Sequence, residues 1–188
     1  MYDSEIFKLI KHHRHMKKRF KGFYARDTLP PLTNSDLQHT FCIIVNTDLV
    51  GEAGEHWILF YWDSLLQIGY FLDPLAQPLL EEFQKWMGCC KTIVLLRHPV
   101  QHHLSMLCGL FVLYFMYHLC AGVSVLDVVK RFSSSNLWLN DKLVSHFAKQ
   151  KLHYTPQPLY KAERRGGRKN VADRMSRKSN DLWLHKER

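Results

Sequence analysis

The sequence has no pair of cysteines at the Cys-x-x-Cys spacing that zinc sites use. Two of its five cysteines, Cys89 and Cys90, are adjacent, which does not suit a metal site. Without a signal sequence, five cysteines argue against a disulfide scaffold and for a reducing, intracellular compartment. We therefore expect neither a metal nor a small organic cofactor.

A long apolar run is also missing. The best candidate, 104–119, is too short for a transmembrane span and contains His118, and the N-terminal residues Met1–Glu5 lack the basic start and apolar middle of a signal peptide. We expect no membrane partner. At 188 residues, of which 46% are hydrophobic, the chain can bury a core. One domain is predicted over 1–160.

Acidic residues are absent from residues 8–26, which contain eight Lys and Arg, although the whole chain has a net charge of +9. Residues 161–188 contain ten Lys and Arg against four acids, whereas 27–160 contain eight against eleven. Basic ends on a mildly acidic core favour a polyanionic partner, most simply DNA. A solubilising tail or a localisation signal is the alternative interpretation.

Hydrophobic patterning predicts an α+β fold. We interpret four apolar runs as strands: 41–46, 56–62, 68–72 and 92–96. Each run is flanked by Gly, Asn, Asp or Pro, and the first three are expected to form an antiparallel meander. Helical spacing predicts a basic N-terminal helix within 1–19, a buried helix from Leu110 to about Gly122, and three others at 77–87, 124–132 and 140–150. Leu29–Leu32 is expected to be an extended connector, and 161–188 a basic, mobile tail in which Leu182–Leu184 could dock.

Cys108 is predicted at the first turn of the buried helix. Backbone N–H groups and the helix dipole there favour the thiolate, the form that attacks carbonyl carbons. Gln101 stands upstream on a loop that could fold back and direct its amide at a developing oxyanion. The alternative is that Cys108 is a buried, inert thiol, as many helical cysteines are.

A cysteine nucleophile needs a base, and His56 begins a predicted strand. Asp73 closes the next strand, so pairing of the two strands as a hairpin would make His56 and Asp73 neighbours. Asp73 would then orient the imidazole. Alternatively, His56 is a core histidine and Asp73 a turn carboxylate before Pro74.

These residues resemble a known family. The order Gly54-x-His56-Trp57, then 70–74 (Tyr-Phe-Leu-Asp-Pro), then 100–111 (Val-Gln-x-x-x-Ser-x-x-Cys-Gly-Leu-Phe) is similar to that of the adenovirus endopeptidases, or adenains. The strings at 20–23 and 42–47 also resemble that family rather than its relatives, the SUMO- and ubiquitin-like-specific proteases. The similarity covers roughly residues 20–147.

The resemblance implies a papain-like cysteine protease with a mixed, largely antiparallel sheet packed by helices. It implies Cys108 as nucleophile, His56 as general base and acid, Asp73 as orienting residue and Gln101 as oxyanion donor. It further implies polypeptide substrates cleaved at glycine-containing sites during virion maturation, in the virion and host nucleus. An activating viral peptide, joined through Cys90, and DNA are the implied cofactors; alternatively, Cys90 merely ends a helix.

The sequence departs from the adenoviral pattern at several points. Asp73 stands where those enzymes usually have Glu, His102 and His103 occupy a loop that is small and polar there, and the basic tail has no counterpart that we recognise. Two other functions stay open. One is a deubiquitinase or SUMO-type protease, and the other is a non-catalytic, basic DNA-binding core protein.

Overall fold

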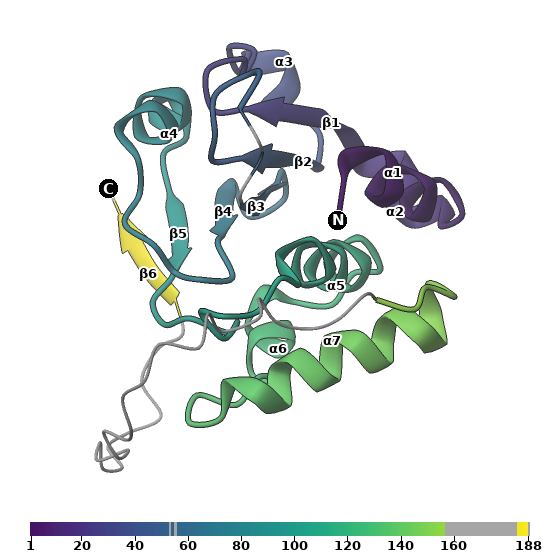
Figure 1. Cartoon of the computed structure of the whole chain (residues 1–188). Coiled ribbons are helices and arrows are strands. Elements are labelled where there is room, and N and C mark those ends of the chain that lie inside the picture. Colours follow the sequence, from purple (N-terminus) through teal and green to yellow (C-terminus); the bar gives the residue numbers. More distant parts are fainter. Residues whose placement is uncertain (53, 55, 157–183, 188) are drawn as a thin grey trace.

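The structure, a computed structural model, describes residues 1–52, 54, 56–156 and 184–187. They form an α+β fold with one six-stranded mixed sheet in the order β1-β2-β3-β4-β5-β6, and helices lie on both of its sides (Figure 1). The strands are β1 (Phe20–Ala25), β2 (Phe41–Asn46), β3 (Trp57–Asp63), β4 (Ile68–Leu72), β5 (Ile93–Leu96) and β6 (Leu184–Glu187). The helices are α1 (Asp3–Lys11), α2 (Arg14–Arg19), α3 (Asn34–Leu37), α4 (Glu81–Trp86), the 3-10 turn η1 (Met87–Cys89), α5 (Cys108–Cys120), α6 (Val125–Val129) and α7 (Leu137–Lys151).

The centre of the sheet is the meander expected from the sequence. Strand β2 pairs antiparallel with β3, and β3 pairs antiparallel with β4. Strands β1 and β5 flank this meander and pair parallel with β2 and β4, while β6 pairs antiparallel with β5. The predicted α+β class with a mixed sheet is therefore confirmed.

Both faces of the sheet are buried, and β2 shows how. Cys42 and Ile44 point into the core on the α5 side, whereas Phe41, Ile43 and Val45 point into the core shared with α4. Side chains alternate between faces along a strand, so a strand buried on both faces needs an unbroken apolar run. That is the pattern found in the sequence.

Helix α5 is the central helix of the larger core. Ten of its thirteen residues are buried, and it lies against the sheet, with α6 and α7 beyond it (Figure 1). The helix begins at Cys108 and is capped by Ala121, after which Gly122 adopts a φ of +90°. A left-handed glycine is a common helix terminator, and it stands where the sequence predicted the end of the helix.

The N-terminal region differs from the prediction of one basic helix. It forms two helices, α1 and α2, because His13 adopts an extended conformation between them. Ile6, Ile10 and Met16 anchor both helices in the core on the α5 side. The strand β1 that follows was not predicted, because it contains Lys21 and a glycine.

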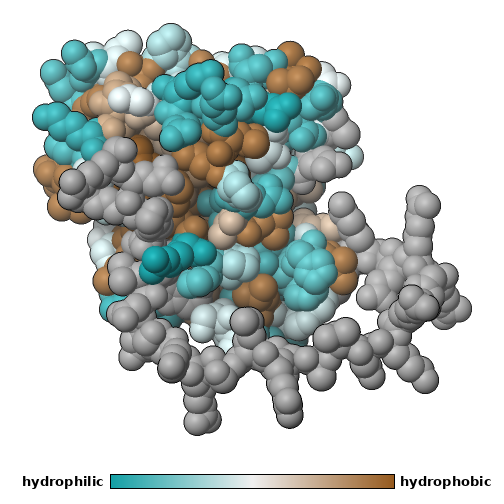
Figure 2. Space-filling view, turned by 90° about the vertical axis from the view of Figure 1, so that its left-hand side faces the viewer, coloured by the Kyte–Doolittle hydropathy of each residue, from teal (hydrophilic) through white to brown (hydrophobic). Residues whose placement is uncertain are grey.

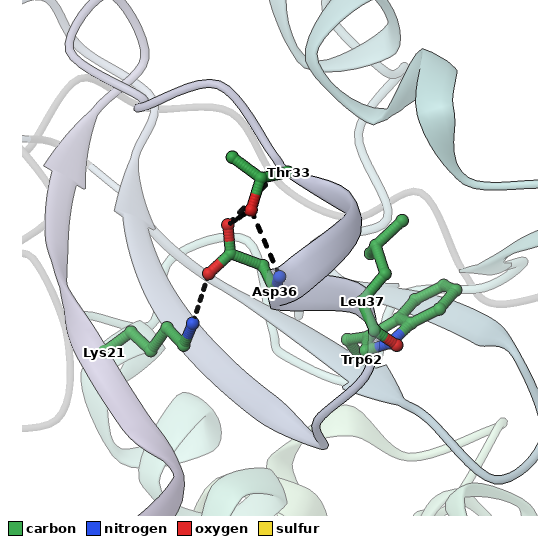
Figure 3. Close-up of polar contacts among 5 residues, drawn as sticks. All are labelled: Lys21, Thr33, Asp36, Leu37 and Trp62. Carbon is green, nitrogen blue, oxygen red and sulfur yellow. Dashed lines mark hydrogen bonds and ion pairs between the residues drawn. The ribbon is translucent and has the colours of Figure 1, made fainter.

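Helix α3 ties two strands together (Figure 3). The Thr33 hydroxyl accepts a hydrogen bond from the Asp36 N–H at 3.1 Å, and it donates one to the Asp36 carboxylate at 2.6 Å. Lys21 on β1 forms an ion pair with Asp36 and lowers the pKa of that carboxyl to about 2. Trp62 on β3 donates its indole N–H to the Leu37 carbonyl at 2.8 Å. These contacts fix the segment that follows the predicted connector.

Other boundaries move by a few residues. Helix α4 starts four residues later than predicted and continues into η1, whereas α7 starts three residues earlier. Ser124 caps α6 as predicted, since its hydroxyl accepts a hydrogen bond from the Asp127 N–H at 3.1 Å. No helix in the part of the chain that the structure describes is long and apolar enough to cross a membrane.

Most of the segment expected to be a tail, 161–183 together with Arg188, lies outside the described residues. Residues 184–187 form β6, in which Leu184 is paired with Leu96 of β5. Figure 2 views the side on which α4, β5 and β6 lie in Figure 1. Hydrophobic surface on this face gathers mainly in the upper half of the molecule, the half that contains α4 (Figure 2).

Candidate active site

The hairpin of β3 and β4 brings His56 and Asp73 together. His56 immediately precedes β3, Asp73 immediately follows β4, and Leu59 pairs with Leu72 near those ends. The Nε2 atom of His56 lies 2.6 Å from the Oδ1 atom of Asp73. Both side chains are buried, with 6% of His56 and 4% of Asp73 exposed. Water therefore competes little for this contact.

The Asp73 carboxylate is fixed by the chain that follows it. Oδ1 accepts a hydrogen bond from the Leu75 N–H at 2.8 Å, and Oδ2 accepts one from the Gln77 N–H at 2.9 Å. Such Asx-type bonds hold an aspartate at a turn, which is the alternative role considered for this residue. Here the turn also aims the carboxylate at His56, so both roles are satisfied at once.

Cys108 is the first residue of α5 and its side chain is partly exposed. His56 acts on it electrostatically and is a main cause of the lowered pKa of its thiol. Since Nε2 of the imidazole is occupied by Asp73, the ring presents Nδ1 to the thiol. Asp73, His56 and Cys108 thus form one line of interacting side chains, with His56 in the middle.

The charges in this line reinforce each other. Burial by itself raises the pKa of Cys108, but its hydrogen bond to His56, the His56 charge, and the backbone N–H groups of Trp57 and Gly109 outweigh burial and lower it. Burial by itself lowers the pKa of His56, but Asp73 and Cys108 together raise it to about 9. The arrangement therefore favours a thiolate beside an imidazolium.

Gln101 lies on the loop of residues 99–107, which leads into α5. It is 2% exposed, and its Nε2 donates a hydrogen bond to the Ser105 carbonyl at 2.9 Å. Its Oε1 is buried without a hydrogen-bond partner among the described residues. An amide nitrogen carries two hydrogens, so one N–H of Gln101 remains after the bond to Ser105.

The 99–107 loop is tied to the rest of the site by its first residues. The Val100 and Gln101 N–H groups both donate to the Pro74 carbonyl, at 2.9 and 3.0 Å, directly after Asp73. The Asn140 amide of α7 donates to the Val100 carbonyl at 2.9 Å. The loop thus folds back as the sequence suggested, and it lies between the β4 end and α7.

Two residues of this region were missed as contributors. Ser105 was noted only as part of a motif, yet its carbonyl accepts from Gln101 and its hydroxyl accepts from the Leu107 N–H at 3.3 Å. Asp141 on α7 is completely buried against the loop. A helical aspartate ordinarily faces water, so the sequence pattern around Asp141 did not indicate this burial.

Cys90, in contrast, does not join this group. It caps η1 and is partly buried against the core on the α4 side, the opposite face of the sheet from α5. Burial and the adjacent Cys89 raise its pKa to about 12. At neutral pH Cys90 is therefore a thiol with little thiolate character.

Two grooves border the site. One is lined by residues on either side of Cys108 in sequence, by the first residues of the chain and by residues that follow α7: Met106, Leu107, Leu110, Met1, Tyr2, Glu5, Tyr154 and Pro156. The other contains Trp57, whose indole donates to the Met1 carbonyl at 3.0 Å. Gly109 permits the close approach of Met1, because a Cβ there would lie 3.0 Å from the Met1 sulfur.

A comparison with known proteins finds one informative relative. The chain is 30% identical over 115 residues to a protein named Protease from human adenovirus B serotype 3, an alignment that covers 53% of this chain and 50% of that protein. The chain thus spans about half the length of this curated relative. No protein-family model matches the chain. The predicted relationship to the adenovirus proteases is confirmed by this similarity.

Proposed function

We propose that this protein is a cysteine endopeptidase of the papain-like class, with Cys108 as nucleophile. The observation that carries the proposal is the buried His56–Asp73 pair, 2.6 Å apart, which acts on Cys108 so that the pKa of the thiol is lowered and that of the imidazole is raised to about 9. The similarity to a protein named Protease supports the same reaction class. An inert buried thiol would have its pKa raised instead.

In the first half of the reaction, the Cys108 thiolate adds to the carbonyl carbon of a peptide bond. The oxyanion that forms accepts hydrogen bonds from the free N–H of the Gln101 amide and from the Cys108 backbone N–H. His56 then donates its Nδ1 proton to the leaving amine nitrogen, the C–N bond breaks, and a thioester on Cys108 remains. Asp73 holds the imidazole with Nε2–H toward its carboxylate throughout.

In the second half, a water molecule attacks the thioester. His56 accepts a proton from this water at Nδ1, the oxyanion forms again beside Gln101, and the C–S bond breaks. The products are the free carboxylic acid and the Cys108 thiolate. The site returns to the ion-paired state, because His56 has regained its proton.

The substrate class in this proposal is viral. We propose capsid or core precursor proteins, cut at glycine-containing sites during virion maturation, in the virion and the host nucleus. The support is the similarity to an adenovirus protein and the family-like motifs around His56 and Cys108 in the sequence.

Two further partners belong to the proposal. DNA would bind the basic segment 8–26, where Lys17 and Lys18 on α2 are exposed, together with the basic residues of the tail. An activating viral peptide would bind through Cys90, whose raised pKa slows thiol–disulfide exchange at neutral pH. Both proposals derive from the family resemblance and the charge distribution.

The test is labelling with a peptide-based electrophile that carries glycine before the reactive carbon. We expect mass spectrometry to find the adduct on Cys108, and we expect Cys108→Ala to abolish both labelling and peptide cleavage without unfolding the domain. Cys89→Ala, which changes an exposed thiol, is the matched control. Peptide cleavage by Cys108→Ala at the parent rate would refute the thiol protease, and preferred labelling by a ubiquitin-fold probe would favour the SUMO-type alternative.

A further inference from the structure

Asp141 is an unusual residue at its position in α7. Its side chain is 0% exposed, and neither carboxylate oxygen makes a well-formed hydrogen bond to another described residue. Burial of a carboxyl without good partners is costly, so such a residue is rarely kept for stability alone. The catalytic line of Cys108, His56 and Asp73 does not include it.

The polar groups that act on the Asp141 carboxyl belong to the 99–107 loop. The Ser105 hydroxyl and the His102 backbone N–H favour its charged form, although burial, the larger effect, raises the pKa to about 6. The adjacent Asn140 donates to the Val100 carbonyl at 2.9 Å. Two consecutive residues of α7 therefore face the loop, one at its beginning and one near its end.

Ser105 connects Asp141 to two parts of the site. Its carbonyl accepts the hydrogen bond from Gln101 Nε2 at 2.9 Å, and its hydroxyl accepts from the Leu107 N–H at 3.3 Å. Leu107 is the N-cap of α5 and directly precedes Cys108. A shift of Ser105 would thus turn the Gln101 amide, which is hydrogen-bonded to the Ser105 carbonyl.

We propose that Asp141 is a positioning residue for the 99–107 loop, and that it acts through Ser105 to hold the Gln101 amide in the orientation that an oxyanion requires. This inference rests on the cysteine-protease function proposed above. Asp141 touches neither substrate nor sulfur in this role. Burial of the Asp141 carboxyl is unfavourable for stability, and its function in this role is to keep the Gln101 amide fixed at the reacting centre.

The test is a double-mutant cycle between Asp141→Asn and Gln101→Ala, measured as kcat and KM on a fluorogenic peptide with two glycines before the scissile bond. We expect Asp141→Asn to lower kcat about tenfold with KM unchanged. In the Gln101→Ala background the same change should alter kcat less than about twofold, because the amide that Asp141 positions is gone. Asp127→Asn, an exposed acid on α6, is the matched carboxyl-to-amide control.

A second measurement separates positioning from loss of structure. The rate at which iodoacetamide alkylates Cys108 needs no oxyanion, so it should be the same in Asp141→Asn and the parent. Equal losses of kcat in both Gln101 backgrounds, or a parallel loss of alkylation, would overturn the inference. If Asp141→Asn fails to fold, Ser105→Ala takes its place in the cycle, and additivity with Gln101→Ala would overturn the inference equally.

The same data distinguish the two proposals. A parent chain with no peptide turnover and no preferential alkylation of Cys108 overturns the protease itself, and this inference with it. An active parent whose kcat is unaffected by Asp141→Asn overturns only the role of Asp141.

Discussion

His56 Nε2 and Asp73 Oδ1 lie 2.6 Å apart, and the two residues meet because each occupies the same end of a two-stranded hairpin. The hairpin is antiparallel, so the residue before β3 and the residue after β4 lie at the same end of the two strands, within reach of each other. The contact consequently depends on the register of the hairpin and not on any flexible loop. A rigid pair of this kind is well suited to hold an imidazole in one tautomer.

The pH dependence of the reaction should follow from this pair. Activity needs the Cys108 thiolate and the His56 imidazolium together, so it should rise through the lowered pKa of the thiol and fall above about pH 9. Asp73→Asn keeps a hydrogen-bond acceptor and removes the charge that raises the His56 pKa. In pH profiles of kcat/KM, the activity of this variant should therefore decline at a pH below 9. A decline at the same pH as in the parent would contradict the role of Asp73.

Gln101→Ala should lower kcat on the order of a hundredfold, the typical loss for one oxyanion donor. The rate of alkylation of Cys108 should not change, because that reaction forms no oxyanion. Gln84→Ala, an exposed glutamine of α4, is the control. A variant with unchanged kcat and a higher KM would make Gln101 a substrate-binding residue.

Asp141→Asn should make the protein more stable at pH 7.5. The folded-state pKa of Asp141, about 6, lies above the ordinary value of 3.8, so the folded chain holds this proton more tightly. Its stabilising effect is complete below about pH 4 and is lost as the pH rises through about 6. Melting temperatures should thus favour the variant at pH 7.5 and converge with the parent near pH 4. A variant that is less stable at pH 7.5 would show that the carboxylate is well satisfied.

DNA binding should weaken with salt, and the exposed residues Lys17 and Lys18 should contribute to that dependence. Replacing both by Ala should make the slope of log K against log salt less steep by about two, since each phosphate contact on duplex DNA contributes about 0.9. Lys142→Ala with Lys149→Ala, two exposed residues of α7, is the matched control. Arg19 is not a suitable target, because it donates to the Leu119 and Cys120 carbonyls. Equal slopes in all three proteins would refute this role of α2.

Cys90→Ser should remove any response to a cysteine-containing activating peptide of the same virus, whereas Cys89→Ser should retain it. The adduct should form slowly at pH 7 and faster in alkali, because the pKa of Cys90 is raised to about 12. Intact mass before and after reduction measures the adduct directly. Identical activation of both variants would eliminate the disulfide.

The central fold was predictable because short, local sequence patterns determine its strands. Each strand of the meander is an apolar run with its own boundary residues, and the register of β3 with β4 follows from one short turn. The pairing of His56 with Asp73 could be anticipated for the same reason. The start of α5 could be anticipated as well, since an apolar segment of this length from Leu110 is expected to be a buried helix in a chain of this size.

What could not be predicted depends on contacts far apart in the sequence. Strand β1 is stable only because β2 offers it a parallel partner, and its exposed Lys21 is typical of a connector. An aspartate in a helix is expected to face water, so nothing local signals that Asp141 is buried. Its position becomes meaningful only when α7 lies against the 99–107 loop.

The acidity of Cys108 exists only in the folded chain, because His56 and the Trp57 N–H, which lower its pKa, come from a distant part of the sequence, and the Gly109 N–H belongs to the first turn of the folded α5. Cys42, 0% exposed beneath α5 with its pKa raised by burial, is hidden in that same state. A brief alkylation pulse should therefore mark Cys108 in native molecules and Cys42 only in molecules that have opened. The chain thus contains its own pair of reporters, and the ratio of the two labels measures the native population at any denaturant concentration.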